Sequence, residues 1–116
     1  MGEAGGAFVF AGPTSLLDAR DIAPVLVGPH HLILVRTGER VVAADRACPH
    51  EGADLALGRC SEGRLLCPRH LAWFDLRSGR VSAGWSFCGL RLFPVERRAD
   101  GYWVALDPIP PAPSRR

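Results

Sequence analysis

The sequence predicts an all-β fold in which antiparallel base sheets carry an inserted subdomain. Apolar runs of strand length alternate with turn residues, and 13 Gly and 10 Pro occur among the 116 residues, which is typical of a chain of short strands. Between about residues 45 and 84, Gly and Pro are frequent and the apolar runs shorten. We therefore expect a single domain over residues 1–106, with a subdomain inserted at about residues 45–84.

Six apolar or β-branched runs are expected to form the strands of the base sheets, at residues 7–10, 25–27, 31–35, 41–44, 90–95 and 102–106. The T-G-E-R run at residues 37–40 predicts a hairpin turn, which makes the neighbouring strands a meander. Asp100-Gly101 is a strong hairpin signal before the last strand. These turns favour antiparallel pairing between strands that follow each other in the chain.

Three further segments complete the expected elements. A helical turn is predicted within residues 16–22, capped by Thr14 or Ser15 and stopped by Pro24. In the subdomain, strands are expected at residues 65–66 and 73–75, with a turn at 77–79. The Pro-rich tail, residues 107–116, is expected to be extended or disordered because Pro cannot continue a sheet.

Two short motifs carry the chemistry of the chain. The run C-P-H begins at Cys48 and ends at His50, and the run C-P-R-H begins at Cys67 and ends at His70. Sixteen residues separate His50 from Cys67. Each motif therefore offers one thiolate and one imidazole, and the Pro after each Cys suits a tight loop around a metal centre. The four side chains form a candidate set of metal ligands.

This ligand set leaves three readings open. Two Cys and two His suit tetrahedral zinc, although zinc fingers group like ligands, whereas each motif here mixes them. A 2Fe–2S cluster with a Cys end and a His end matches two loops that each give one ligand to each iron. Disulfides among the four Cys are the third reading, but no secretory context supports them.

The residues around the ligands resemble those of Rieske-type ferredoxins, the ferredoxin components of ring-hydroxylating oxygenase systems. Residues 48–55 are similar to the family's C-P-H-x-G-A-x-L stretch, and residues 67–70 and 74–79 to its C-P-x-H and F-D-x-x-S/T-G motifs. The resemblance covers roughly residues 7–106. One departure stands at Leu71, where the family usually has Gly. Such a Gly often adopts a positive φ, which Leu tolerates poorly.

The resemblance implies a Rieske-like fold and one 2Fe–2S cluster per chain. Cys48 and Cys67 would bind the buried ferric iron, and His50 and His70 the outer iron that becomes ferrous. The implied function is one-electron transfer from an NAD(P)H-dependent flavin reductase, the ferredoxin reductase, to a terminal oxygenase. The chain itself would be no enzyme.

The same resemblance bears on the residues near the ligands. High-potential Rieske proteins have hydroxyl donors where this chain has Ala72 and Phe74, so we expect a potential in the lower part of the Rieske range. Cys60 and Cys88 lie outside the ligand motifs and are expected to be small buried hydrophobic residues.

Two other functions remain possible from the sequence. The 46 residues after His70 contain no His, so this chain alone cannot carry the catalytic iron site of a Rieske oxygenase. It could still be an electron-supplying subunit or fragment of a larger Rieske oxygenase. Alternatively it would be a zinc-stabilised interaction module.

Charge and hydropathy limit the partners and the location. A formal net charge of +2 is too small to indicate binding to nucleic acid or to a membrane. No apolar run approaches the ~20 residues that cross a bilayer, and no secretory signal is visible at the N-terminus. A cytoplasmic location is therefore expected.

Overall fold

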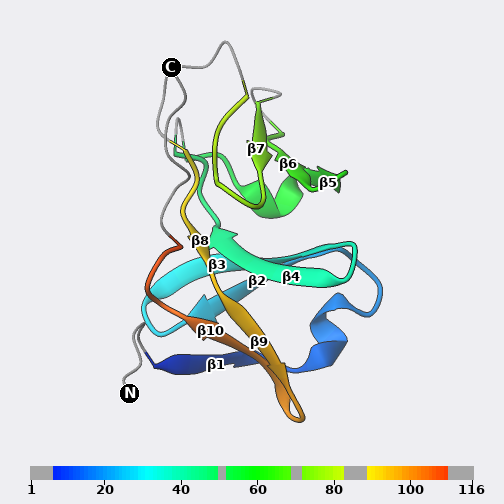
Figure 1. The fold of residues 1–116 in the computed structure, drawn as a ribbon, viewed down its shortest axis with the longest axis vertical. Helices are drawn as coiled ribbons and strands as arrows, with labels where there is room; N and C mark the ends of the chain where they lie inside the picture. The colour runs from blue at the N-terminus through cyan, green and yellow to red at the C-terminus, as the bar shows by residue number, and fades with distance from the viewer. Residues whose placement is uncertain (1–6, 50–51, 69–71, 83–88, 110–116) are drawn as a thin grey trace.

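The computed structural model describes residues 7–49, 52–68, 72–82 and 89–109 (Figure 1). These residues form three antiparallel sheets and two short 3-10 helices. The all-β prediction is confirmed. None of the described helices is long and apolar enough to cross a membrane.

The central sheet has four strands in the order β2-β3-β4-β8. They are β2 (Ile22–Val27), β3 (His30–Thr37), β4 (Arg40–Asp45) and β8 (Leu92–Phe93). Gly28 and Gly38 begin the two-residue turns between the first three strands, with φ of 60° and 64°. The predicted meander is confirmed, and these strands extend one to three residues beyond the expected limits.

The inner strands β3 and β4 of the central sheet are buried on both faces over most of their length, which explains their nearly continuous apolar sequence. Ile33 and Val35 of β3 pack into one core cluster, whereas Leu32 and Leu34, on the opposite side of the strand, pack into another. This alternation follows from the two-residue period of a strand. The central sheet therefore separates two cores.

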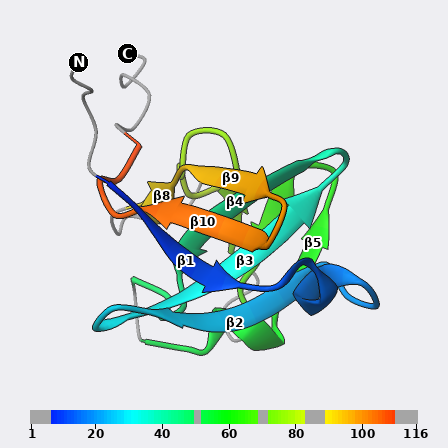
Figure 2. The same ribbon diagram turned by 90° about the horizontal axis from the view of Figure 1, so that it is seen from below.

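The second base sheet has the order β1-β10-β9. Its strands are β1 (Phe8–Gly12), β9 (Val95–Arg98) and β10 (Gly101–Ala105). Seen from below, β9 and β10 cross in front of β3 and β4 (Figure 2). Phe93, Tyr102 and Val104 are buried in the core between the two base sheets, which we call the base core.

The third sheet comes from the segment between β4 and β8 and lies at one end of the molecule (Figure 1). It contains β5 (Arg59–Ser61), β6 (Arg64–Leu66) and β7 (Trp73–Asp75), and the 3-10 helix η2 (Leu55–Leu57) precedes it. Leu55, Leu65 and Phe74 are fully buried against the central sheet, in what we call the upper core. The strands expected at residues 65–66 and 73–75 are confirmed, whereas β5 and η2 were not predicted.

The helical turn differs from its prediction. The 3-10 helix η1 covers Thr14–Leu17, with Pro13 at its N-cap and no side-chain cap. The predicted cap by Thr14 or Ser15 is therefore wrong. Pro24 does not stop this helix but lies inside β2 and pairs with Ile33. It is tolerated because β2 is an edge strand, where a missing N–H can face outward.

The single strand predicted at residues 90–95 is also wrong, because Pro94 divides it. Leu92 pairs with β4 of the central sheet, whereas Val95 begins β9 of the second base sheet. Pro lacks the N–H that would continue a ladder. The division lets one segment of chain contribute to both base sheets.

The tail is described as far as Ile109. The Ile109 N–H donates to the Leu92 carbonyl oxygen at 2.7 Å, and its side chain packs against the upper core. Residues 110–116 lie outside the described part of the chain, so the predicted extended or disordered tail stays a prediction there.

Gly79→Ala is expected to lower the free energy of unfolding by roughly 2–3 kcal/mol. Gly79 has φ of 78°, which costs about 1 kcal/mol once a Cβ is present. That Cβ would also meet the Leu90 carbonyl oxygen, so the backbone must move, at a further cost. Urea denaturation measures the loss. Gly38→Ala is the matched control, because its φ is 64° with open space around the new Cβ, and it should lose only about 1 kcal/mol.

Candidate metal centre

Cys48 and Cys67 begin two loops that close in the same way. The Cys48 N–H donates to the Ala53 carbonyl oxygen at 2.8 Å, and the Cys67 N–H donates to the Ala72 carbonyl oxygen at 2.9 Å. In both loops the acceptor follows the Cys by five positions. Each loop therefore has its Cys at the narrow end of a closed hairpin-like turn.

The residues just outside the loops pair in the same register. Ala47 pairs with Asp54 in an isolated bridge, and Leu66 pairs with Trp73 at the end of β6 and β7. Each residue of the second pair lies 19 positions after its counterpart in the first pair. The ends of the first loop (residues 48–53) and of the second loop (residues 67–72) thus pair in the same register, and each loop begins with a Cys-Pro pair.

The equivalence of the loops bears on the unusual Leu71. Gly52, 19 positions earlier, has φ of 75°, a conformation that favours Gly. Leu71 itself lies outside the described residues, so the effect expected of a Leu at this position stays a prediction from the sequence.

Both cysteines are buried in the upper core. Cys48 is 2% exposed and Cys67 is fully buried, and both belong to the same cluster of packed side chains, together with Leu55 and Phe74. Two buried thiolate donors brought together from two loops fit the sulfur end of a mixed-ligand iron–sulfur cluster.

The other two predicted ligands, His50 and His70, lie outside the described residues. The structure therefore places two of the four candidate ligands and does not test the imidazole pair. Cys88 and Arg69 lie outside the described residues as well.

An ion pair holds the base of the first loop. Arg46 donates from Nε and Nη2 to the two carboxylate oxygens of Asp54, each at 2.9 Å. Asp54 also accepts from the Ala56 N–H at 3.0 Å, so it caps η2. The hydrogen bond from Arg46 lowers the pKa of Asp54, and burial opposes this only in part. The Arg46–Asp54 pair joins the two chain segments that enter and leave the loop.

Sequence reasoning missed this role of Asp54, because a charged residue near a loop is usually only solvated. Two signals were available. Asp is a favoured N-cap, and here it directly precedes the run L-A-L of η2. Arg46 lies eight positions earlier. It directly precedes Ala47, which pairs with Asp54 across the base of the first loop.

A cavity of about 600 Å³ lies beside the first loop, and its lining includes Cys48, Pro49 and His31. A second ion pair borders it, in which Arg91 donates to the Asp45 carboxylate at 2.8 and 3.0 Å. His31 is exposed on β3, as expected for a surface histidine. The first loop is therefore flanked by two Arg–carboxylate pairs.

Two buried side chains at the end of the second loop and just after it, those of Ala72 and Phe74, supply no hydrogen-bond donor. Ala72 and Phe74 are fully buried, and neither side chain carries an N–H or O–H group. This agrees with the expected potential in the lower part of the Rieske range, which remains a prediction.

Cys60 is only half-buried, so the predicted buried position holds in part; burial raises the pKa of its thiol.

Comparison with known families decides the classification. The family described as the Rieske [2Fe-2S] domain matches residues 7–94. The chain belongs to this family. The match includes both loops and all four candidate ligands. A Rieske domain carries one 2Fe–2S cluster, and it transfers electrons without itself being a catalytic enzyme.

Two curated relatives show where such domains occur. The ferredoxin component of the alkene monooxygenase system of Xanthobacter autotrophicus is 31% identical over 85 residues, which cover 72% of this chain and 69% of that protein. The oxygenase subunit of vanillate O-demethylase from a Pseudomonas species is 36% identical over 74 residues, 58% of this chain. The chain spans only 22% of that subunit.

Solved structures show the same fold. The ferredoxin of carbazole 1,9a-dioxygenase from Nocardioides aromaticivorans superposes with a TM-score of 0.75 at 25% identity, covering 86% of this chain and 98% of that one. A chain from the complex of reduced oxygenase and oxidized ferredoxin in carbazole 1,9a-dioxygenase gives a TM-score of 0.73 at 25% identity, covering 84% and 92%. The predicted Rieske-like fold is confirmed.

Asp54→Asn is expected to lower the free energy of unfolding at neutral pH by no more than about 1 kcal/mol, since the Arg46–Asp54 pair is partly exposed. The folded pKa of Asp54 is lowered, so its stabilisation is complete above the unfolded pKa of about 3.9. It is lost as the pH falls through the folded pKa. The variant should therefore lose less stability on acidification than the parent, as urea denaturation from pH 7 to pH 3 measures.

The control for this prediction is Glu96→Gln. Glu96 pairs with Arg98 at 2.8 Å in an exposed position, where an ion pair contributes little. If both variants lost the same stability at neutral pH, the Arg46–Asp54 pair would be an ordinary surface pair.

Proposed function

We propose that this chain is a one-electron carrier, a Rieske-type ferredoxin that delivers electrons to a terminal oxygenase. The observation that supports the proposal is a pair of loops whose ends close in the same way within a Rieske domain, each beginning with a Cys (Cys48 or Cys67) that is buried in the same core. When bound, the 2Fe–2S cluster supplies a centre that is reduced and reoxidised by one electron. The chain supplies the residues that would hold this cluster.

Cys48 and Cys67 would hold the inner iron, and His50 and His70 the outer one. The buried thiolates remove the sulfur end from water, and the apolar upper core, with Leu55 and Phe74, keeps water away from it. Neutral imidazoles on the outer iron leave the centre less negative than four thiolates would, which raises the reduction potential. The loops, closed by backbone hydrogen bonds, keep the ligands in place, so little rearrangement accompanies electron transfer.

The partners follow from the relatives. One relative is named as the ferredoxin component of an oxygenase system, and one structural neighbour comes from a complex of an oxygenase and a ferredoxin. We propose a terminal oxygenase as the acceptor and an NAD(P)H-dependent flavin reductase as the donor, in the cytoplasm. The donor is the less supported partner, because it rests on the sequence resemblance alone.

A second candidate is an electron-supplying domain within a larger oxygenase. The similarity to the vanillate O-demethylase oxygenase subunit, of which this chain spans 22%, favours it. In both candidates the loops and their ligands would hold a cluster that transfers one electron. The two candidates differ only in whether the oxygenase is a separate protein.

The purified protein tests the proposal. We expect about two irons and two sulfides per chain, a red-brown colour, and a rhombic EPR signal after reduction with dithionite. Zinc in stoichiometric amount, without iron or sulfide, would support the zinc-stabilised interaction module instead. Stopped-flow mixing of the reduced protein with an oxidised Rieske oxygenase then tests electron delivery. A spectrum of this protein that stays in the reduced form would contradict the proposed delivery.

A further inference from the structure

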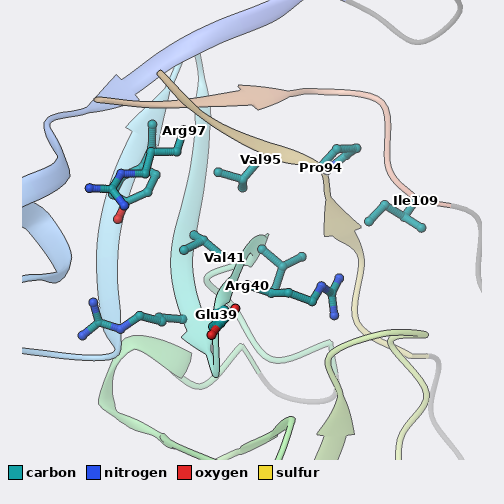
Figure 3. A pocket seen from close by; sticks show the side chains of 10 residues that line it. Glu39, Arg40, Val41, Pro94, Val95, Arg97 and Ile109 are labelled. Atoms are coloured by element: carbon teal, nitrogen blue, oxygen red, sulfur yellow. The ribbon is translucent and has the colours of Figure 1, made fainter. Parts of the chain in front are cut away.

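A cavity of about 660 Å³ opens at the edge of the base core, between the β3–β4 hairpin and β9. Arg97 and Val95 of β9 lie across from Val41 of β4 there, and Ile109 closes one side (Figure 3). The cavity does not include the ligand loops. Arg40 begins β4, whereas Cys48 follows the other end of that strand, roughly 17 Å away along its length.

Tyr102 gives this cavity a polar group. It lines the cavity but is only 5% exposed. Tyr102 and Arg97 are direct cross-strand partners, so both side chains stand on the same face of the sheet. Among the described residues, no group hydrogen-bonds with the Tyr102 hydroxyl. No buried side-chain oxygen among the described residues lacks a partner, so the Tyr102 hydroxyl is the part of this side chain that reaches the cavity.

The rim of the cavity carries one excess positive charge. Arg36, Arg40 and Arg97 line it together with Glu39. Arg36 is already paired with Asp21 at 3.3 Å, whereas Arg40 and Arg97 have no carboxylate partner among the residues that the structure describes. After Glu39 and Asp21 are counted against the three Arg, a formal charge of +1 remains. This charge suits a ligand with a single negative charge.

The rest of the wall is apolar. Val41, Val42, Val95, Pro94 and Ile109 line it, and Val41 and Val95 pack directly against the base core. The volume lies within the range of small-molecule sites, which combine an apolar wall with a few placed polar groups. A small inorganic ion would use the charge but not the wall.

We propose that this cavity binds a small organic monocarboxylate with an aromatic or branched apolar body. The carboxylate lies beside Arg97 and accepts a hydrogen bond from the Tyr102 hydroxyl, and the apolar body lies against Val41 and Val95 (Figure 3). The site is separate from the metal centre, so its occupation does not require the 2Fe–2S cluster to change its ligands.

Isothermal titration calorimetry of the cluster-loaded protein at constant ionic strength tests this site, with sodium benzoate as the probe. We expect saturable binding of benzoate and none of benzyl alcohol, which keeps the ring but lacks the charge. Sodium sulfate, which has charge but no apolar body, should bind at least tenfold more weakly. Arg97→Gln should weaken benzoate binding about tenfold, the usual effect of losing one charge-assisted hydrogen bond, and Arg40→Gln, on the opposite side of the cavity, should weaken it less.

Tyr102→Phe and Arg59→Gln make the test specific. Tyr102→Phe removes a hydroxyl that has no hydrogen-bond partner among the described residues, so it should weaken binding several-fold while the melting temperature stays unchanged. Arg59→Gln removes an equal charge from an exposed residue outside the cavity and should leave benzoate binding intact.

Three results in these titrations would overturn the proposal, and a fourth comes from a different probe. They are the absence of saturable benzoate binding at millimolar concentration, equal binding of sulfate and benzoate, or an equal loss in Arg59→Gln and Arg97→Gln. Binding of an acidic peptide in place of benzoate would also overturn it and assign the cavity to a protein partner.

Discussion

Cys67→Ala is expected to lose the 2Fe–2S cluster, so that the purified variant is colourless and contains no stoichiometric iron or sulfide. Cys67 is fully buried at the start of the second loop, and no other described thiol occupies an equivalent place in that loop. Removing a thiolate ligand leaves the inner iron with an incomplete set of ligands. Because a metal site also stabilises the fold that forms it, the melting temperature of the variant should fall as well.

Cys60→Ala is the matched control. It removes a thiol that is half-buried and lies outside both loops, where its Sγ donates to the Arg36 carbonyl oxygen at 3.6 Å. This variant should keep its full complement of iron and sulfide and its visible absorbance. If it lost as much cluster as Cys67→Ala, or if Cys67→Ala stayed fully loaded, the proposed ligand assignment would be wrong.

His70→Cys should lower the reduction potential by roughly 100 mV or more, provided that the cluster assembles. A thiolate at this position adds a negative charge to the reducible iron. Four-thiolate 2Fe–2S centres of the plant type lie near −400 mV, whereas Rieske centres span about −150 to +300 mV. Protein-film voltammetry measures the shift, and His50→Cys should move the potential in the same direction.

His30→Cys controls for the mere addition of a thiol. His30 lies at the start of β3, outside the candidate ligand set, so the potential should stay within error of the parent. An assembled His70→Cys cluster with an unchanged potential would remove His70 from the ligand set, and with it the proposed division between a sulfur end and a nitrogen end.

The base sheets were predictable from the sequence because their signals are local. Gly28 and Gly38 mark tight turns, and apolar runs mark strands that are buried on both faces. The errors arose at proline. Pro24 reads as a helix stop but sits on the edge of a sheet, and Pro94 divides one apolar run between two sheets. Sheet membership depends on distant partners, which local sequence does not contain.

The site shows the same division between local and distant information. Cys48 and Cys67 were predicted because ligand type and spacing lie within short motifs. The short elements β5 and η2 were missed because three residues carry too little pattern and rely on packing in the upper core. The Arg46–Asp54 pair was missed because its two members meet only after the first loop has closed.

The equal closure of the two loops limits how this site can change. Cys48 and Cys67 keep corresponding places because six residues span each loop, from 48 to 53 and from 67 to 72. Inserting a single residue into either loop would change the spacing between its Cys and the residue that closes the loop. The two loops would then no longer close in the same way, even with every donor atom retained. The backbone closure thus constrains the length of each loop, which an inventory of ligand types does not reveal.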